Sequence, residues 1–412
     1  MTRELIMSKY GGVMPRYGPL SIVVPGMVGG VHALWQRHGS MEWGGDLLRP
    51  AVRLAEAGLP VMPRLEGALN SLRETYHDDE TARTYLANRW ERIDMRRLGK
   101  TIGGIAEAGP SFFYKEVGEA ITEYVNSMGG AFSLSDFKDY TPEWREPLKA
   151  EYRGCTVFES PPPNSQGLTT LIILRDVESR GLPANAKDRI DVLLDIYRKA
   201  YSLRDEHIGD PRFVDVPIDS LLKFNAAGPP NANNKILEGD TTNFVVIDEA
   251  GNIVSAIQSL YHPFGSRITE PTYQITLNNR ASDFKLDGPN GVAPRKRPPL
   301  HTLSSMIIEK GGGEPMAAIG ISGGGHFRPQ QHVLLLMNLI DNGMDIVNAI
   351  DAPRFLWDGN EVFAEEGGVD APIRKIKYPG ATGVAHAIQI LGRERIAYAD
   401  PRGGDGLAVG QY

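Results

Sequence analysis

The feature that most constrains the fold is an abrupt change of pattern near the middle of the chain. Residues 228–240 are rich in Pro, Asn and Gly and have no hydrophobic period, which indicates an exposed linker. Directly after it, alternating residues predict strands at 243–248 and 253–261, joined by a turn at Glu249-Ala250-Gly251-Asn252. A β-hairpin therefore starts where an accessible linker ends. The junction between Asp240 and Thr241 is suited to chain cleavage.

Cleavage at this junction would create a catalytic group. Thr241 would gain a free α-amine beside its own hydroxyl group. An α-amine has a pKa of about 7.7 to 8.0, which suits a general base at neutral pH. One threonine would then supply both the nucleophile and the base that accepts its proton. We therefore expect Asp240–Thr241 to be the cleavage site and Thr241 to be catalytic.

The hairpin register brings a second hydroxyl group close to Thr241. With a two-residue loop at 250–251, counting outward pairs Thr241 with Leu260 and Thr242 with Ser259. A shift of one residue in the loop would place Ser259 opposite Thr241 itself. In both registers these residues are cross-strand neighbours, with about 5 to 7 Å between their Cβ atoms. Ser259 could therefore orient the nucleophile, or it could be only a polar residue on a strand face.

Three consecutive glycines, Gly323, Gly324 and Gly325, separate a predicted strand at 316–322 from a predicted helix at 333–344. Glycine lets backbone N–H groups approach a substrate without side-chain obstruction, which suits an oxyanion site. The same layout could hold a phosphate at a helix N-terminus, although the Walker sequence is absent, or could be a turn only. The glycine pattern alone leaves these three alternatives open.

The composition is that of an ordinary globular protein. The 412 residues are 41% hydrophobic and 23% charged, enough for one large or two medium domains. The net charge of -7 gives no basic surface for nucleic acid, and the best apolar run, 168–174, is too short to span a membrane. The single cysteine, Cys155, excludes an intrachain disulfide. We expect no metal and no other cofactor.

The other segments are assigned from periodicity and turn residues. The N-terminal part is expected to be rich in helices, including one at 113–128. A strand at 152–159 is followed by Ser-Pro-Pro-Pro-Asn and then by an apolar helix from Gly167. Residues 1–10 lack the apolar region of a secretory signal, so the chain as written is expected to be cytoplasmic.

Several motifs together resemble the gamma-glutamyltranspeptidase family. The ten residues from Gly239 to Asp248, Gly-Asp-Thr-Thr-Asn-Phe-Val-Val-Ile-Asp, are similar to the start of that family's small subunit. The resemblance covers nearly the whole chain, and the combination of motifs is highly specific. Further matching motifs are Gly18-Pro19-Leu20-Ser21, Val24-Pro25-Gly26, the segment from Pro161 to Gly167, Phe264-Gly265-Ser266, Lys296-Arg297-Pro298, Ala352-Pro353-Arg354 and Asp400-Pro401-Arg402-Gly403.

The resemblance implies a fold and a maturation step. The fold would be α+β, a four-layer αββα sandwich of the N-terminal-nucleophile hydrolase type. Autocatalytic cleavage before Thr241 would leave two fragments that stay together as a heterodimer. These would be a helix-rich large-subunit-like segment, 1–240, and a small-subunit-like segment, 241–412. An acyl group on Thr241 would then be released by water or by an amine acceptor.

The resemblance also implies roles for individual residues. Gly323 and Gly324 match the family's oxyanion glycines, and Ser259 matches a hydroxyl residue that assists the nucleophile. Asp283 matches the aspartate that binds the α-amino group of the acyl donor. Ion pairing makes this role reasonable, although an Asp in an exposed loop is usually only solvated.

The expected donor pocket departs from that of the family's glutamyltransferases. Tyr261 replaces an Asn, Arg280 replaces a Gln, and His301-Thr302 replaces a Ser-Ser pair. Arg280 could bind a carboxylate and favour another acidic acyl group, or it could be a surface ion-pair partner. His301 and His326 could each bond a substrate or be structural. These differences are typical of the hydrolase-like branch, which includes cephalosporin-type acylases.

A second departure concerns the N-terminal part. Met1 matches an interior point of the family's large subunit, so about a hundred or more residues of the usual chain are expected to be absent. A partner chain could supply them, the sequence could be truncated, or Arg280 could replace a lost arginine.

Three functions follow as hypotheses. The first is an amidohydrolase that acts on a gamma-glutamyl or other small acidic amide. The second is a glutathione gamma-glutamyltransferase, and the third is a catalytically inactive member of the family.

Overall fold

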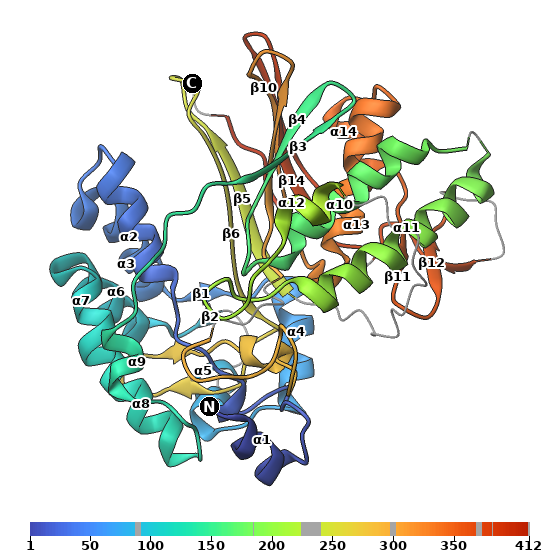
Figure 1. Ribbon diagram of the computed structural model, residues 1–412. Helices are drawn as coiled ribbons and strands as arrows, with labels where there is room; N and C mark the ends of the chain where they lie inside the picture. The colour runs from blue at the N-terminus through green and yellow to red at the C-terminus, as the bar shows by residue number, and fades with distance from the viewer. Residues whose placement is uncertain are drawn as a thin grey trace. The chain divides into compact units, whose positions relative to one another are not determined.

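The computed structural model describes residues 1–86, 92–183, 185–223, 240–296, 302–367, 373–380 and 382–410 (Figure 1). The chain divides into two compact units, each of which takes residues from both sides of position 240. Unit 1 comprises Met1–Trp144, His262–Leu286 and Gly291–Arg295, and unit 2 comprises Arg145–Tyr261, Asp287–Asn290 and Lys296–Tyr412.

Unit 1 is mostly helical, as expected. The helix predicted at 113–128 is confirmed, because Phe113, Val117, Ile121 and Val125 recur every four residues and are all buried. The helical elements of unit 1 are α1 (Arg3–Tyr10), η1 (Pro19–Ser21), α2 (Met27–His38), η2 (Trp43–Leu48), α3 (Arg49–Ala57), α4 (Pro63–Arg73), α5 (Asp79–Tyr85), α6 (Arg96–Ala108), α7 (Pro110–Phe112), η3 (Phe113–Val117), α8 (Gly118–Ser127), α9 (Leu134–Lys138) and η4 (Arg280–Asp283). Its strands are β1 (Leu59–Pro60), β2 (Arg92–Ile93), β7 (Thr269–Glu270) and β8 (Ile275–Thr276).

Unit 2 contains an antiparallel six-stranded sheet in the order β15-β14-β10-β9-β4-β3. The strands of unit 2, inside and outside this sheet, are β3 (Leu148–Tyr152), β4 (Cys155–Glu159), β5 (Asp240–Ile247), β6 (Ile253–Tyr261), β9 (Ser305–Lys310), β10 (Glu314–Ser322), β11 (Phe355–Trp357), β12 (Val362–Glu365), β13 (Arg374–Ile376), β14 (Val384–Leu391) and β15 (Glu394–Ala399). Its helical elements are α10 (Ser165–Arg180), α11 (Ala186–His207), α12 (Ile218–Lys223), η5 (Gly325–Phe327), α13 (Arg328–Leu336), η6 (Met337–Asp341) and α14 (Ile346–Asp351).

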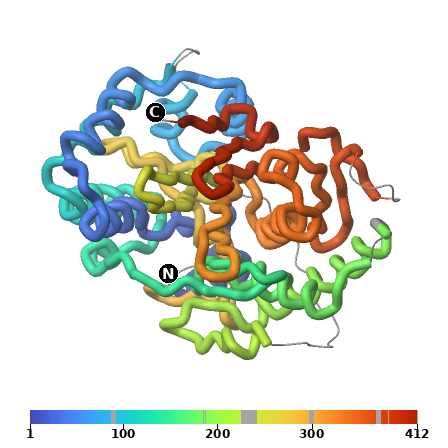
Figure 2. Tube along the Cα trace, turned by 90° about the horizontal axis from the view of Figure 1, so that it is seen from above, coloured from blue at the N-terminus to red at the C-terminus, as the bar shows by residue number. Residues whose placement is uncertain are grey.

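Three layers stack within unit 2 (Figure 1). Helices cover one face of the six-stranded sheet, with α10 on β3 and β4, α13 on β10, and α14 on β14 and β15. The helices of residues 165–180, in green, and 328–336, in orange, lie next to each other in Figure 2. Hairpin β5–β6 packs on the other face of the sheet, against β9, β10 and β14. The middle strand β10 is therefore buried on both faces from Met316 to Ser322.

Two predicted elements differ from the structure. The strand expected at 152–159 is the end of β3, a tight turn at Arg153-Gly154 with positive φ at both residues, and β4. The helix expected at 333–344 begins earlier, at Arg328. Its first residues are polar but buried, so the hydrophobic period could not reveal them. The predicted linker at 228–240 lies outside the described residues, except for Asp240 at the start of β5.

Candidate active site

Thr241 and Ser259 lie side by side on hairpin β5–β6. Asp248 donates its backbone N–H to the carbonyl of Asn252, so the loop has three residues and not two. The strands consequently follow the register that is shifted by one residue, with Ile247 opposite Ile253, and the pairing changes again between Asp240 and Thr242. The Thr241 hydroxyl donates to Ser259 Oγ at 3.2 Å. The expected contact between the two hydroxyl groups is present.

The Ser259 hydroxyl is fixed by a second donor. The backbone N–H of Tyr261 donates to Ser259 Oγ at 2.8 Å. This contact requires a sharp bend, and Tyr261 has φ +89°, a conformation that bulky residues rarely adopt and that costs about 1 to 3 kcal/mol. Because Ser259 Oγ accepts two hydrogen bonds, its own proton is left to donate to another group. Ser259 therefore sits in a defined orientation beside the Thr241 hydroxyl.

Tyr261 is fully buried and contacts the residue that follows the glycine loop. Its hydroxyl lies 3.3 Å from His326 Nε2, and Arg204 Nη1 lies 3.2 Å from His326 Nδ1. A guanidinium can only donate, so Nδ1 accepts and the ring proton is on Nε2, which donates to Tyr261. His326 thus links the glycine loop to the end of β6. Its main-chain carbonyl also accepts from the hydroxyl of Tyr201 at 2.5 Å.

Sequence reasoning missed Arg204 and Tyr201 on α11. Tyr197, Tyr201 and Arg204 recur at helical spacing, and all three are buried. A charged residue at the end of an otherwise apolar helix face was the available signal. Sequence alone could not pair this face with His326, because 122 residues separate Arg204 from it.

The hairpin is aligned with the strand that leads into the glycine loop. A Cβ atom on Gly320 would lie 2.5 Å from Asn243 Nδ2, and Ser255 Oγ donates to the carbonyl of Ile319 at 3.1 Å. Asn243 Oδ1 also lies 3.1 Å from Nδ1 of His386 on β14. Thr241 is two residues, about 7 Å, beyond Asn243 on the same face of β5. It is therefore directed along β10 toward Ser322 and the glycines that follow.

The glycine loop presents backbone donors. Gly323 has φ +65°, which favours glycine, and Gly324 precedes the short helix η5. Neither residue donates its backbone N–H to another group within the described part of the chain. Both N–H groups are consequently available to an oxyanion.

Arg280 and Asp283 lie in unit 1, on η4, and both are buried, with 4% and 8% of their surfaces exposed. Neither side chain is therefore exposed, in contrast to the surface position weighed for Arg280 and the solvated loop weighed for Asp283. Two asparagines before η4 hold it in place. Asn278 pairs through its side-chain amide with the backbone N–H and carbonyl of Val23, and Asn279 donates to the carbonyl of Arg16 at 2.8 Å.

His262 lies in the same charged cluster of unit 1. Burial and the positive charge of Arg16 lower the pKa of His262 to about 4, although the carboxylate of Asp283 acts in the opposite direction. Asn279 Nδ2 donates to His262 Nδ1 at 2.8 Å, which fits a neutral ring. Arg280 also lowers the pKa of this histidine, and unlike the exposed Arg16 it is buried.

The last two predicted pocket residues are only partly described. Thr302 is fully buried in the segment before β9, and His301 lies outside the described residues. Two residues on, Ser304 Oγ donates to Glu159 at 2.5 Å, which anchors this segment to β4.

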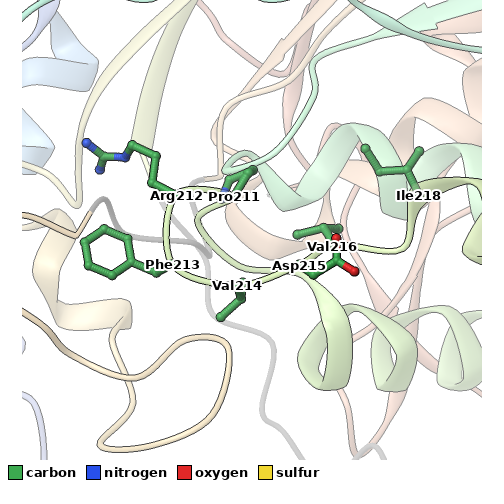
Figure 3. Close-up of a pocket in the computed structure, with 7 residues that line it drawn as sticks. All are labelled: Pro211, Arg212, Phe213, Val214, Asp215, Val216 and Ile218. Atoms are coloured by element: carbon green, nitrogen blue, oxygen red, sulfur yellow. The ribbon is translucent and has the colours of Figure 1, made fainter.

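The segment that connects α11 to α12 lines a surface hollow of about 410 Å³ (Figure 3). Arg212, one of its side chains, pairs with Asp210 at 2.6 Å. None of the predicted site residues lines it. Its lining residues are Pro211, Arg212, Phe213, Val214, Asp215, Val216 and Ile218.

The described residues contain neither a metal site nor a membrane-spanning helix. No group of three or more His, Cys, Asp or Glu side chains in them is arranged to hold a metal ion. Among the same residues, no helix is both long and apolar enough to cross a membrane.

The fold is that of an N-terminal-nucleophile hydrolase, and Thr241, the second residue of β5, lies beside Ser259. The gamma-glutamyltranspeptidase family model matches residues 2–410. The chain belongs to the gamma-glutamyltranspeptidase family.

Named relatives include enzymes of two kinds. The chain is 33% identical to the glutathione hydrolase-like YwrD proenzyme of Bacillus subtilis, over 95% of this chain and 81% of the relative. It is 28% identical to the acylase ACY 1 proenzyme of a Pseudomonas species, over 85% of this chain and 66% of the relative. The cephalosporin acylase structure from Bacillus halodurans superposes with a TM-score of 0.85 at 27% identity, covering 97% of this chain and 81% of that one.

These matches confirm the predicted α+β class and the αββα sandwich of the N-terminal-nucleophile hydrolases. The chain is a gamma-glutamyltranspeptidase-like amidohydrolase, and autocatalytic processing is typical of its family.

Proposed function

We propose that the chain cleaves itself between Asp240 and Thr241 and then hydrolyses amides of small acidic acyl groups, among which gamma-glutamyl is one. The observation that carries this proposal is the 3.2 Å hydrogen bond between the hydroxyl groups of Thr241 and Ser259. Through this bond Ser259 orients the hydroxyl of Thr241, and cleavage would release the α-amine of the same residue. The fragments 1–240 and 241–412 would remain together as partners.

Each step of the proposed reaction uses groups of this chain. In self-cleavage, the Thr241 hydroxyl oxygen adds to the Asp240 carbonyl carbon, and the peptide C–N bond breaks as the Thr241 nitrogen takes up the hydroxyl proton and becomes the free α-amine. Water then hydrolyses the resulting ester, which leaves a carboxylate on Asp240 and restores the Thr241 hydroxyl. In turnover, the same oxygen adds to the substrate carbonyl, and its proton passes to the free α-amine and then to the leaving amine. The N–H groups of Gly323 and Gly324 stabilise the negative charge on the carbonyl oxygen. Water then hydrolyses the acyl ester and restores the hydroxyl.

The charges of unit 1 support an acidic acyl group. Arg280 is buried, and a guanidinium binds a carboxylate through two parallel hydrogen bonds. We propose that Arg280 binds a carboxylate of the acyl group and that Asp283 binds an amino group where one is present. We also propose that Tyr261, Thr302 and His301 take part in substrate binding, as the family resemblance implies. The names of the relatives, a glutathione hydrolase-like protein and two acylases, agree with an acyl-transfer reaction.

The first test is the mass of the purified protein. We expect two fragments, the smaller beginning at Thr241, and we expect Thr241→Ala to remain as one uncut chain without amidase activity. An uncut wild-type chain that hydrolyses amides would overturn the proposal. An uncut and inactive wild-type chain would favour the inactive alternative, and the same spectrum would reveal any second chain that travels with the protein.

The second test separates hydrolase from transferase. Release of a chromogenic amine is measured from gamma-glutamyl and glutaryl anilides, with and without a dipeptide acceptor. We expect hydrolysis of the glutaryl compound and little acceleration by the acceptor. A strong preference for gamma-glutamyl that rises with the dipeptide would favour a glutathione gamma-glutamyltransferase.

A further inference from the structure

The helix that follows the glycine loop buries polar side chains where apolar ones are expected. Arg328, Gln330, Gln331 and His332 of α13 are all fully buried. Burying a polar group is costly unless it is hydrogen-bonded, and each of these side chains makes at least one hydrogen bond. Arg328 Nε donates to the Ile321 carbonyl, and the amide of Gln330 pairs with the backbone of Trp357, while His332 bonds Glu159.

Gln331 differs from its neighbours because its amide lies between two glycines. A Cβ atom on Gly324 would lie 2.2 Å from Gln331 Oε1, and one on Gly383 would lie 2.4 Å from Gln331 Nε2. Nε2 donates to the Thr382 carbonyl at 2.5 Å, which fixes which end of the amide faces Gly324. The side chain therefore sets the spacing between the glycine loop and the Thr382-Gly383 segment.

A buried charge network holds Thr382-Gly383 from the other side. Arg354 donates to the carbonyl of Gly383 at 2.9 Å and pairs with Asp400 at 2.6 Å. Glu365 accepts from the Thr382 hydroxyl at 2.9 Å and pairs with Arg402 at 2.6 Å. Removing one partner from such a pair leaves an uncompensated buried charge, so the network resists movement. Gln331 thus packs between the glycine loop and the segment that the charge network holds.

A loop of three glycines has unusual backbone freedom, yet an oxyanion site must be rigid to be effective. A displacement of about 1 Å can cost about 100-fold in rate. We propose that Gln331 is a positioning residue that holds the backbone N–H groups of Gly323 and Gly324 in place for the oxyanion. This inference rests on the proposed hydrolase function.

The test compares two buried glutamines. Gln331→Met keeps the length of the side chain and removes the hydrogen bond to Thr382. The matched control is Gln389→Met, because Gln389 is also buried and accepts a backbone N–H, from Ile346 at 3.0 Å. Gln389 pairs with Ala317, at the other end of β10 from the glycine loop. Both variants are expected to lose similar thermal stability.

The kinetic constants distinguish positioning from stability. For Gln331→Met we expect a fall of about 10- to 100-fold in kcat and in the rate of self-cleavage, with KM changed by less than about threefold. For Gln389→Met we expect constants close to those of the wild type. A Gln331→Met enzyme with wild-type kcat would overturn the inference and leave the proposed function intact. A wild type that neither cleaves nor turns over would overturn both.

A second variant, Gln331→Glu, tests the donor at position 331. A protonated Glu can donate to the Thr382 carbonyl, whereas its carboxylate cannot. The activity of Gln331→Glu relative to the wild type should therefore rise as the pH is lowered. This variant also provides a test if Gln331→Met does not fold. An activity of Gln331→Glu relative to the wild type that stays constant with pH would contradict the inference.

Discussion

The two charged regions of the molecule are built in opposite ways. In unit 2, Arg354, Glu365, Asp400 and Arg402 form a buried network in which each charge has a partner of opposite sign within 2.6 to 3.1 Å. In unit 1, the groups that act on His262 include two arginines and one aspartate. A compensated network stabilises backbone geometry, whereas a buried guanidinium such as that of Arg280 suits an anionic ligand. The first region is therefore structural, and the second is proposed to select the substrate.

The largest expected effect is on the compensated network. Glu365→Gln should lower the free energy of unfolding by about 3 kcal/mol, because it leaves Arg402 without its carboxylate partner. Denaturant unfolding at pH 7 measures this change. The control is Glu366→Gln, at an exposed neighbouring position, which should change stability by less than about 0.5 kcal/mol. Equal effects of the two variants would contradict a structural role for the network.

The carboxylate of Glu365 should also make the free energy of unfolding depend on pH in the acidic range. Burial alone would raise the pKa of Glu365, but hydrogen bonds from Arg402 and from the backbone N–H of Arg354 outweigh it and lower the pKa to about 2. A lowered pKa means that the stabilisation is present above the ordinary value of 4.5 and is lost as the pH falls toward 2. Glu365→Gln should flatten this part of the stability profile.

The next largest effect is expected on kcat/KM when Arg280 is substituted. Arg280→Gln should lower kcat/KM for a glutaryl amide by about 100-fold, because a charge-assisted bond to the substrate carboxylate is lost. Self-cleavage before Thr241 should be unchanged. Arg280→Lys, which keeps the charge without the planar guanidinium, should fall between the two. A loss of self-cleavage in Arg280→Gln would show that the residue does more than bind the acyl group.

A smaller effect is expected at the hairpin in unit 2. Ser259→Ala should slow self-cleavage and lower kcat by about tenfold, since it removes one hydrogen bond to the nucleophile. Ser255→Ala is the matched control, because Ser255 lies on the same strand and bonds the carbonyl of Ile319. Fragment ratios and initial rates measure both variants. Equal rates for the two variants would show that Ser259 does not assist catalysis.

The smallest expected effect is on His262. Its pKa of about 4 lies below the unfolded value of 6.5, so the unfolded chain binds more protons between these values and stability falls as the pH is lowered. Between pH 7 and 5.5 this amounts to about 1 kcal/mol. Urea unfolding of His262→Asn should show that this loss has disappeared, whereas exposed His38→Asn should retain it. An unchanged profile in His262→Asn would contradict a buried, neutral ring.

The sequence predicted much of hairpin β5–β6. The bounds of β6 and the neighbour relation of Thr241 and Ser259 followed from alternation and from counting along two adjacent strands. The register itself required the structure, because a two-residue and a three-residue loop are both compatible with Glu249-Ala250-Gly251. The division of the chain into units could not be predicted, because residues after β6 enter unit 1 before the chain returns to unit 2.

The sequence by itself determined the kind of enzyme and its candidate nucleophile, because local alternation, turn residues and family motifs all lie within short stretches of chain. Only the tertiary structure decided which distant side chains support these residues. Arg204 reaches His326 across 122 residues, and Gln331 reaches Thr382 across 51. Buried polar contacts of this kind depend on which helix packs on which strand, and no periodicity in the sequence encodes that choice.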